Sequence, residues 1–391
     1  MAETNRAARR LLAPEADIIT IGLMSGTSLD GVDAVAVRFP GEGAMKTLGA
    51  SHVPMPSALR RELFSLAQGG GADEIERMGA AGQALAACYA EAVGLLLKKL
   101  RRSAREIAAL GAHGQTIRHR PKAGFTLQLN DPARLAELTG IDVVADFRTR
   151  DVAAGGEGAP LVPAFHARAF GCARARAVLN IGGIANATWI PAAADLQEKP
   201  VLGCDTGPGN MLLDSFVRRT CGAPYDKDGA LAAQGQENAA LLARCLSDPF
   251  FARPAPKSTG REEFSDRWLD EKLRGFEGLR AADVMATLCA LTAESAAEMI
   301  ARVEPKTESV LVCGGGALNP VLMTRLRAAL ERRIPGIALA DTSCEGIDPM
   351  AVEGAAFAWL AKAFLCGEPG NLPAVTRAAG LRRLGAYYPA D

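Results

Sequence analysis

Residues 18–37 constrain the fold of this chain more than any other stretch. Two apolar runs rich in β-branched residues, Ile18–Ile21 and Val32–Val37, flank a polar loop with the sequence Ser25, Gly26, Thr27, Ser28, Leu29, Asp30, Gly31. Such runs on either side of a glycine-containing turn are typical of strand, tight turn and strand. The alternative is a polar hairpin turn that binds nothing.

The loop has the composition of an anion-binding turn. Glycine lets the backbone approach a ligand, successive N–H groups form a nest for anions, and Thr27 and Ser28 add hydroxyl donors. Asp30 and Asp33 would repel a bare phosphate, so a phosphate site here needs a cation or a donor nearby. We expect these two carboxylates to act through Mg²⁺ or its waters, because magnesium is commonly held by carboxylates and phosphates.

Composition excludes several classes of function. The 391 residues carry 44 basic and 44 acidic side chains, so neither a nucleic-acid partner nor a membrane surface is indicated. The nine cysteines are scattered without a CxxC pair, as in a reduced, cytoplasmic protein. No apolar run comes close to the roughly 18 to 20 residues that span a bilayer.

Strand and helix patterns alternate through the first half of the chain, which predicts an α/β fold. Helical patterns cover 57–67 and 73–100, and strand patterns cover 107–110, 125–129 and 141–145. Polar residues follow two of these strands, where open α/β sheets place their ligands. They are His113 and Gln115 after the first strand, and Asp146 and Arg148, which flank Phe147, after the last.

From residue 175 the chain repeats the plan of its opening. A strand at 178–181, a turn of Gly182 and Gly183, and a strand at 184–190 with Asn186 as its polar residue again predict strand, turn and strand. A short strand at 201–204 leads into Asp205, Thr206, Gly207, Pro208, Gly209 and Asn210, and a third glycine turn begins at Gly314 and Gly315. The repeat predicts two α/β lobes facing each other across a cleft, with phosphates held by turns from both lobes.

Asp205 is the sharpest catalytic candidate, because a carboxylate just past an apolar strand can act as a positioned base in phosphoryl transfer. The alternative is an aspartate that caps the helix beginning near Met211. Arg148 has the alternative of a structural ion pair, and His113 that of a core histidine. We expect the basic loop around Lys257 to be solvated. No P-loop, dinucleotide fingerprint, HExxH or GxSxG motif occurs.

Eight motifs in order resemble those of the anhydro-N-acetylmuramic acid kinases of bacterial cell-wall recycling. They are GLMSGTSLDGVDAV, GAHGQTIRH, DFR, AAGGEGAPLVPAFH, NIGGIAN, DTGPGNMLLD, PKSTGREEF and CGGGALNP. The resemblance implies an actin-like or hexokinase-like (ribonuclease H-like) fold with an N-terminal lobe at 17–165, a C-terminal helix at 350–391 that packs back on it, and a C-terminal lobe at 166–349. It also implies domain closure around ATP and a homodimer.

The family's reaction is unusual: water opens the 1,6-anhydro bridge of the sugar while O6 takes the γ-phosphate of ATP. By resemblance the catalytic aspartate is Asp205 and the ATP loop is Gly26–Asp33. The full set expected to bind ATP is Gly26, Thr27, Ser28, Leu29, Asp30, Gly31, Val32, Asp33, Asn186, Gly207, Gly209, Asn210, Gly314 and Gly315. Arg148 is expected to contact the lactyl carboxylate of the sugar, and His113, Gln115 and Glu353 are further substrate-side candidates.

Two other functions stay open at this point. One is an ordinary sugar kinase of the same superfamily, which phosphorylates an existing hydroxyl group. The other is a non-catalytic module that responds to nucleotide, as in chaperone or cytoskeletal ATPases.

Overall fold

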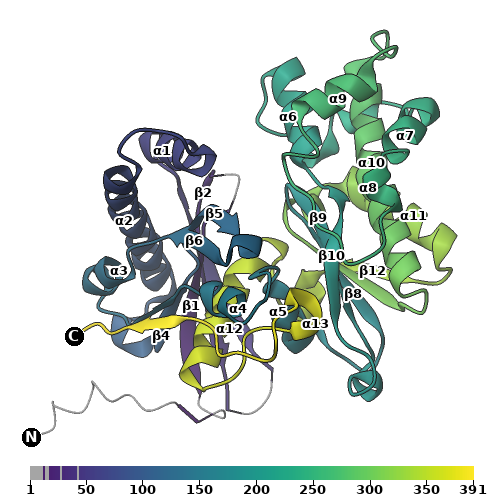
Figure 1. Ribbon diagram of the computed structural model, residues 1–391. Helices are drawn as coiled ribbons and strands as arrows, with labels where there is room; N and C mark the ends of the chain where they lie inside the picture. The colour runs from purple at the N-terminus through teal and green to yellow at the C-terminus, as the bar shows by residue number, and fades with distance from the viewer. Residues whose placement is uncertain (1–11, 14–16, 27–28, 42–43) are drawn as a thin grey trace, which may run out of the picture. The chain divides into compact units, whose positions relative to one another are not determined.

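Two β-sheets with one shared strand order form the computed structural model (Figure 1). One sheet runs β13-β7-β4-β1-β2-β3 and the other β10-β9-β8-β11-β12. In each, three consecutive strands pair antiparallel and two later strands join in parallel beside the first of them. This is the ribonuclease H-like α/β plan, and it confirms the predicted fold class. The structure describes residues 12–13, 17–26, 29–41 and 44–391.

Each sheet belongs to its own compact unit of the chain. The first unit comprises Met1–Ala169 and Ala351–Asp391, and the second comprises Phe170–Met350. The glycine-rich segment 153–163 therefore lies inside the first unit.

The strands of the first unit were mostly visible in the sequence. They are β1 (Ile18–Met24), β2 (Gly31–Phe39), β3 (Lys46–Pro54), β4 (Ala109–Ala112) and β7 (Val143–Ala145), with β5 (Gln115–Arg120) and β6 (Phe125–Leu129) in a separate two-stranded sheet. Its helices are α1 (Ser57–Gln68), α2 (Glu74–Leu100), α3 (Pro132–Thr139), α4 (Thr149–Ala153), α5 (Val162–Phe170, whose last residue falls in the second unit), α12 (Val352–Leu365) and α13 (Pro373–Thr376).

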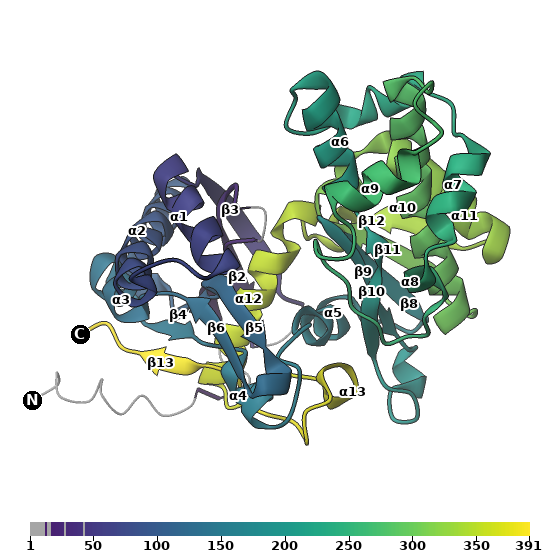
Figure 2. The same cartoon turned by 45° about the horizontal axis from the view of Figure 1, so that its top comes forward.

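Alternation along β1 explains why this sheet is covered on two faces. Ile19, Ile21 and Leu23 belong to the same buried cluster as side chains of α1 and α2, whereas Thr20 donates a hydrogen bond from Oγ1 to the carbonyl oxygen of Ala358 in α12, 2.7 Å away. Successive strand residues point to opposite faces, so α2 and α12 cover opposite sides of the sheet, as Figure 2 shows.

Glycine allows α12 to pack directly on the sheet backbone. A Cβ atom on Gly22 would overlap the carbonyl oxygen of Gly354, and one on Gly111 would overlap that of Phe357. A glycine inside a strand often marks such a close backbone approach. These contacts attach the C-terminal part of the chain to β1 and β4.

The C-terminal stretch is not one helix, which corrects the prediction for 350–391. Helix α12 ends at Leu365, a short helix α13 follows, and β13 (Ala386–Tyr388) pairs antiparallel with β7 at the edge of the sheet. Glycine at 367 and 370 and proline at 369 and 373 interrupt the helical pattern.

The second unit repeats the sheet and adds helices. Its strands are β8 (Arg176–Ile181), β9 (Ile184–Ile190), β10 (Leu202–Pro208), β11 (Ser309–Cys313) and β12 (Ala338–Asp341). Its helices are α6 (Met211–Cys221), α7 (Ala239–Leu246), α8 (Pro249–Ala252), α9 (Asp266–Leu273), α10 (Ala281–Val303) and α11 (Pro320–Arg333). Helices α10 and α11 share a buried cluster with the sheet.

Two helices meet the length and composition of a membrane span, which corrects the expectation that no stretch would. They are α2 and α10, and 50% and 83% of their most apolar windows are buried within the structure. Helix α10 packs on the second sheet, where its Ile300 carbonyl accepts a hydrogen bond from Trp189 Nε1. The burial of α10 is that of a core helix, and α2 contributes its buried face to the core of the first unit.

Candidate functional site

Asp205 lies within strand β10 and not in a turn beyond it, which corrects the sequence-based placement. It pairs with Asn186 on β9, and the register shifts between Asp205 and Gly207. A β-bulge of this kind re-aims a side chain. Helix α6 begins at Met211 with Asn210 as its N-cap, so Asp205 does not cap it.

A loop from outside the sheet holds the backbone and the carboxylate of Asp205. The backbone N–H of Asp205 donates to the carbonyl oxygen of Lys257, 3.0 Å away, and the N–H of Thr259 donates to Asp205 Oδ2 at 2.9 Å. The Thr259 hydroxyl in turn donates to Glu263 at 2.8 Å. Among the described residues, Asp205 Oδ1 accepts no hydrogen bond, so one carboxylate oxygen is fixed and the other is open.

Lys257 is buried although Pro256, Ser258 and other parts of its loop are exposed, so the prediction of a solvated loop was wrong for the lysine itself. Its side chain is only 7% exposed, because Nζ donates to the carbonyl oxygen of Phe250 at 2.9 Å and lies 4.0 Å from the centroid of the Phe250 ring. Burial, together with the positive charge of Arg302, lowers the pKa of Lys257 to about 8.

The environment of Asp205 gives it the pKa of a base that works near neutrality. Burial raises the pKa of Asp205 to about 6, and the negative charge of Glu262 acts in the same direction. The Thr259 N–H and the positive charge of Lys257 favour the carboxylate and oppose part of that rise. A carboxylate with this pKa is mostly ionised at pH 7 and can still accept a proton.

Three predicted glycine turns meet at one end of the second sheet. The N–H groups of Gly209 and Asn210 donate to the carbonyl oxygens of Gly183 and Gly182, at 2.9 and 2.8 Å. Asn210 Nδ2 also donates to the carbonyl of Ile181 at 3.2 Å, the last residue of β8. The β8–β9 turn and the segment after β10 are thereby fixed to each other.

The third turn follows β11 and sits against the same strand end. Gly314 has φ +77, and a Cβ there would overlap the side-chain oxygen of Asn180. An added Cβ on Gly315 would make only an ordinary van der Waals contact, with Asn210 Nδ2 at 3.6 Å. The structure therefore brings Gly209, Asn210, Gly314 and Gly315 together.

Gly207 has a packing role beside Asp205. Its φ is +151, and a Cβ would lie 2.9 Å from the Phe251 ring and 3.1 Å from Ser295 Oγ. Only glycine fits this position. Gly207 therefore shapes the bulge, and the structure gives no reason for it to face a ligand.

The polar loop of the first unit is described in part, because Thr27 and Ser28 lie outside the described residues. Ser25 donates from Oγ to Gln115 Oε1 at 2.5 Å, and both side chains are buried. Gln115 begins strand β5, so it is not in a loop as the sequence suggested. Leu29 has φ +55, a conformation that costs a non-glycine residue about 1–2 kcal/mol.

Asp33 is paired with a histidine across the sheet. Asp33 Oδ1 and His52 Nδ1 are 2.8 Å apart and both side chains are close to half exposed. Burial and, more weakly, the charge of Asp30 raise the pKa of Asp33, against the effect of His52. A Cβ on Gly31 would overlap the His52 ring. Val32 is fully buried and faces the core.

Arg148 and His113 form the polar centre of the first unit. Arg148 Nε and Nη2 lie 3.1 and 2.9 Å from His113 Nε2, and Nη1 donates to the carbonyl oxygen of Gly158 at 2.9 Å. Burial and the Arg148 charge hold the pKa of His113 well below 6.5, so His113 is neutral, with its proton on Nδ1. Burial lowers the pKa of Arg148 to about 10, while the charges of Glu353 and Asp151 act to raise it.

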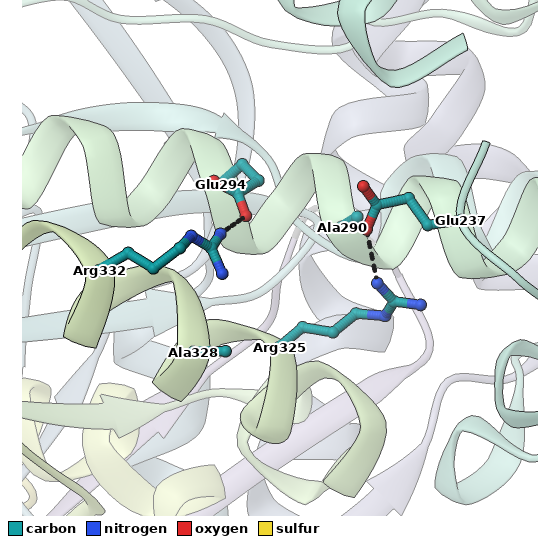
Figure 3. Close-up of a pocket in the computed structure, with 6 residues that line it drawn as sticks. All are labelled: Glu237, Ala290, Glu294, Arg325, Ala328 and Arg332. Atoms are coloured by element: carbon teal, nitrogen blue, oxygen red, sulfur yellow. Dashed lines mark hydrogen bonds and ion pairs between the residues drawn. The ribbon is translucent and has the colours of Figure 1, made fainter. Parts of the chain in front are cut away.

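A separate surface cavity of about 240 Å³ does not involve any of these residues. Figure 3 shows that charged side chains of α10, α11 and the segment before α7 line it, and that they pair with one another. Arg325 lies 2.8 Å from Glu237, and Arg332 pairs with Glu294. Its charges are satisfied internally, so it is not the candidate site.

Sequence reasoning missed the residues that support the candidate base. Lys257, Thr259 and Glu263 come from a loop more than fifty positions after Asp205, and that loop reads as basic and hydroxylated. The one available signal was the aromatic pair Phe250 and Phe251 just before it, which provides the ring and carbonyls that bury Lys257.

Comparison with known proteins gives a consistent result over nearly the whole chain. A family model described as anhydro-N-acetylmuramic acid kinase matches residues 18–390. The protein of that name from Bordetella petrii is 52% identical over 373 residues, which cover 95% of this chain and 96% of that protein. Its namesake from Burkholderia thailandensis is 51% identical over 378 residues, with coverage of 96% and 98%.

Solved structures resemble the chain much less closely. A ROK family glucokinase from Streptomyces griseus in complex with glucose and AMPPNP shows 14% identity and a TM-score of 0.40, and the match covers 88% of this chain and 98% of that one. So low a TM-score supports no assignment.

Proposed function

The chain belongs to the anhydro-N-acetylmuramic acid kinase family, and we propose that it uses ATP to convert 1,6-anhydro-N-acetylmuramic acid into N-acetylmuramic acid 6-phosphate in peptidoglycan recycling. The oxygen of a water molecule forms a bond to the anomeric carbon, and the bond from that carbon to O6 breaks. O6 bonds to the γ-phosphorus of ATP, ADP leaves, and the proton lost by water passes to a base.

The observation that carries this proposal is the carboxylate of Asp205, in which only one of the two oxygens accepts a hydrogen bond from a described residue. Its Oδ2 is fixed by the Thr259 N–H, while Oδ1 has no hydrogen bond among the described residues. We propose that Oδ1 takes the proton from the attacking water. Glycoside cleavage ordinarily needs a second carboxylic acid to protonate the leaving oxygen, but here phosphorus captures that oxygen, so one base suffices.

Backbone groups are the proposed phosphate ligands in both units. In the second unit the turns at Gly209, Asn210, Gly314 and Gly315 lie at one end of the sheet. The N–H groups of Gly209, Asn210 and Gly314 already donate to carbonyl oxygens, so the N–H of Gly315 is the donor proposed for a phosphate there. In the first unit the candidate is the loop from Gly26 to Asp33. Phosphoryl transfer depends mainly on positioning and on charge stabilisation at the phosphate oxygens, which such donors supply.

Arg148 is the proposed ligand of the lactyl carboxylate of the sugar. Neutral His113 accepts from Nε and Nη2, and Gly158 accepts from Nη1. A guanidinium has five N–H donors, so N–H groups on Nη1 and Nη2 are left for a carboxylate. Gln115 and Glu353 stay substrate-side candidates. Asn186, which pairs with Asp205 across β9 and β10, stays a candidate for ATP binding.

Magnesium dependence, a homodimeric state and a cytoplasmic location are finer parts of the proposal and rest on the family resemblance. No group of three metal-binding side chains occurs among the described residues. Asp30 and Asp33 are near enough to interact and fit a water-mediated ion whose other ligands are phosphates. When bound, Mg²⁺ would neutralise phosphate charge. Unchanged magnesium dependence in both Asp30→Asn and Asp33→Asn would exclude these two carboxylates.

The test is ADP release by the purified protein with 1,6-anhydro-N-acetylmuramic acid, compared with glucose and N-acetylglucosamine. We expect turnover with the anhydro sugar alone. The reaction is then run in H₂¹⁸O, where one ¹⁸O atom should appear at the anomeric carbon of the product in a rapid quench. Phosphorylation of an ordinary hexose without ¹⁸O uptake would indicate a conventional sugar kinase, and no ADP release with any sugar would contradict a kinase.

A further inference from the structure

The buried carboxylate of Asp151 in the first unit connects residues 371–382, here called the C-terminal segment, to the loop that contacts Arg148. Asp151, on α4, is fully buried. Its Oδ1 accepts from Asn371 Nδ2 at 2.7 Å and from Thr376 Oγ1 at 2.8 Å, although these residues lie 220 and 225 positions later in the chain. Its Oδ2 accepts from the N–H of Gly158 at 2.8 Å.

Gly158 connects this carboxylate to Arg148. The N–H of Gly158 donates to Asp151, and its carbonyl oxygen accepts from Arg148 Nη1 at 2.9 Å. A Cβ on Gly156 would overlap the Asp151 carboxylate, so the loop passes directly over the carboxylate. The position of the Gly158 carbonyl, and with it one edge of the guanidinium, depends on Asp151.

The C-terminal segment is further attached to the same loop by its backbone. The N–H of Glu157 donates to the carbonyl oxygen of Thr376 at 2.7 Å, and the N–H of Ala379 donates to that of Ala154 at 2.8 Å. Asn371 is itself fixed, because its Oδ1 accepts from the N–H of Arg382 at 2.7 Å. The loop that carries Gly158 is therefore held on one side by α4 and on the other by the C-terminal segment.

We propose that Asp151, Asn371 and Thr376, here called the C-terminal anchor, are positioning residues that set the orientation of Arg148 for the substrate carboxylate. This inference rests on the proposed role of Arg148. The anchor does not touch the substrate and acts through the Gly158 carbonyl.

The negative charge of Asp151 gives this arrangement an electrostatic role in addition to its packing. A buried carboxylate is costly unless hydrogen bonds compensate for its lost hydration, and here three donors do so. The negative charge of Asp151 also favours the protonated form of Arg148 against the effect of burial on its pKa. Loss of one donor should therefore shift the loop that aims the guanidinium.

The first test is Thr376→Val, which removes the hydroxyl donor with little change in volume. Because a hydrogen bond to a charged group is a strong one, we expect the KM for the anhydro sugar to rise about tenfold, with kcat and the KM for ATP within about twofold of wild type. Arg377→Gln is the matched control. It breaks the exposed ion pair with Glu157, 2.8 Å long, on the same segment without touching Asp151, and should leave the sugar KM unchanged.

The decisive test is the double variant Arg148→Ala, Thr376→Val. If the anchor acts through Arg148, adding Thr376→Val to Arg148→Ala should change the sugar KM by less than about twofold, because contacting residues in one network are not additive. A full tenfold additional rise would overturn the inference, and so would a Thr376→Val variant that lowers only the melting temperature. Asn371→Ala should behave like Thr376→Val and guards against a variant-specific artefact.

Failure of the underlying proposal has a different signature. If Arg148→Ala leaves the sugar KM unchanged, the role of Arg148 is wrong and the anchor inference falls with it. If Arg148→Ala raises the sugar KM while Thr376→Val and Asn371→Ala do not, only the anchor inference is overturned.

Discussion

The two sheets place different chemistry at equivalent positions. In the first unit the third residue of β2, Asp33, faces His52 on β3, and in the second unit the third residue of β9, Asn186, faces Asp205 on β10. The Asp33–His52 pair is close to half exposed, whereas Asp205 is partly buried and held by a loop. The same strand order thus presents a half-exposed aspartate–histidine pair in one unit and a candidate base in the other.

The difference arises from what is added to the sheet. In the second unit the helices α6 to α9 and the loop that contains Lys257 lie in the chain between the third strand, β10, and the core helix α10. That loop lies along β10 and supplies the Thr259 N–H. In the first unit the helices α1 and α2 follow β3 directly. The repeated topology sets which strand positions face each other, and the inserted segment supplies the contacts that hold the candidate base Asp205 within β10.

The largest expected effect is the loss of the candidate base. Asp205→Asn keeps the size of the side chain and removes its ability to accept a proton, so turnover should fall by about 10²-fold or more. ATP binding, measured by calorimetry, should be nearly unchanged. Asp195→Asn is a control on a half-exposed aspartate of the same unit, whose partner is Lys199 at 3.6 Å. Near wild-type turnover in Asp205→Asn would remove this residue from the chemistry.

The next prediction concerns stability and compares Gly22, where a side chain would overlap the backbone of α12, with Gly315, where it would not overlap other atoms. Gly22→Ala should lower the free energy of unfolding by about 3 kcal/mol, because its Cβ would overlap the backbone of α12. In Gly315→Ala, in the second unit, the new Cβ makes only an ordinary contact with Asn210, so that free energy should change by less than about 0.5 kcal/mol. Urea denaturation of both variants tests this, and equal losses would contradict the packing described for α12.

A smaller effect is expected from Lys257→Met, which removes the buried positive charge of the loop beside Asp205. The rate at limiting sugar should rise with pH, level off above the Asp205 pKa of about 6, and fall about tenfold per pH unit below it, since the carboxylate is the active form. Lys257→Met removes a positive charge that lowers this pKa, so the acidic limb should move to higher pH and turnover should drop about tenfold.

The control for that variant is Lys306→Met, which replaces an exposed lysine of the same unit. Its pH profile should match that of the wild type. Arg302, Arg253 and Glu263 also face Lys257, and all three are kept in both variants, so the profiles of the two variants and the wild type are compared over the same pH range. An acidic limb at the same pH in Lys257→Met and wild type would exclude an electrostatic role for Lys257.

The smallest effect should come from the exposed pair of the first unit. His52→Ala removes a contact between side chains that are 49% and 45% exposed, so the free energy of unfolding should fall by less than about 1 kcal/mol. The measurement is again urea denaturation, at low and high salt. A loss well above 1 kcal/mol would show that the Asp33–His52 pair stabilises the first unit more than its exposure indicates. It would weaken the contrast drawn with the Asn186–Asp205 pair of the second unit.

Local patterns predicted most of the elements. The hairpin of β1 and β2, the helices α1, α2 and α3, and the strand β11 follow from periodicity and from caps such as Asp131, whose side chain accepts from the Arg134 N–H. The predictions were wrong where a residue's partners in the fold are distant in the sequence. Gln115 was placed in a loop because its pairing strand β6 follows only later in the chain, and β13 was missed because its partner β7 is far away in sequence.

By itself, the sequence determined the α/β class, the repeated strand-turn-strand unit, the family and the identity of the candidate residues, because these depend on periodicity and on motifs that are local in the chain. Only the tertiary structure decided that Lys257 is buried, that Thr259 holds one oxygen of Asp205, and that Thr376 reaches Asp151. These contacts join residues that folding brings together, and burial changes the cost of a charge in a way that no local pattern records.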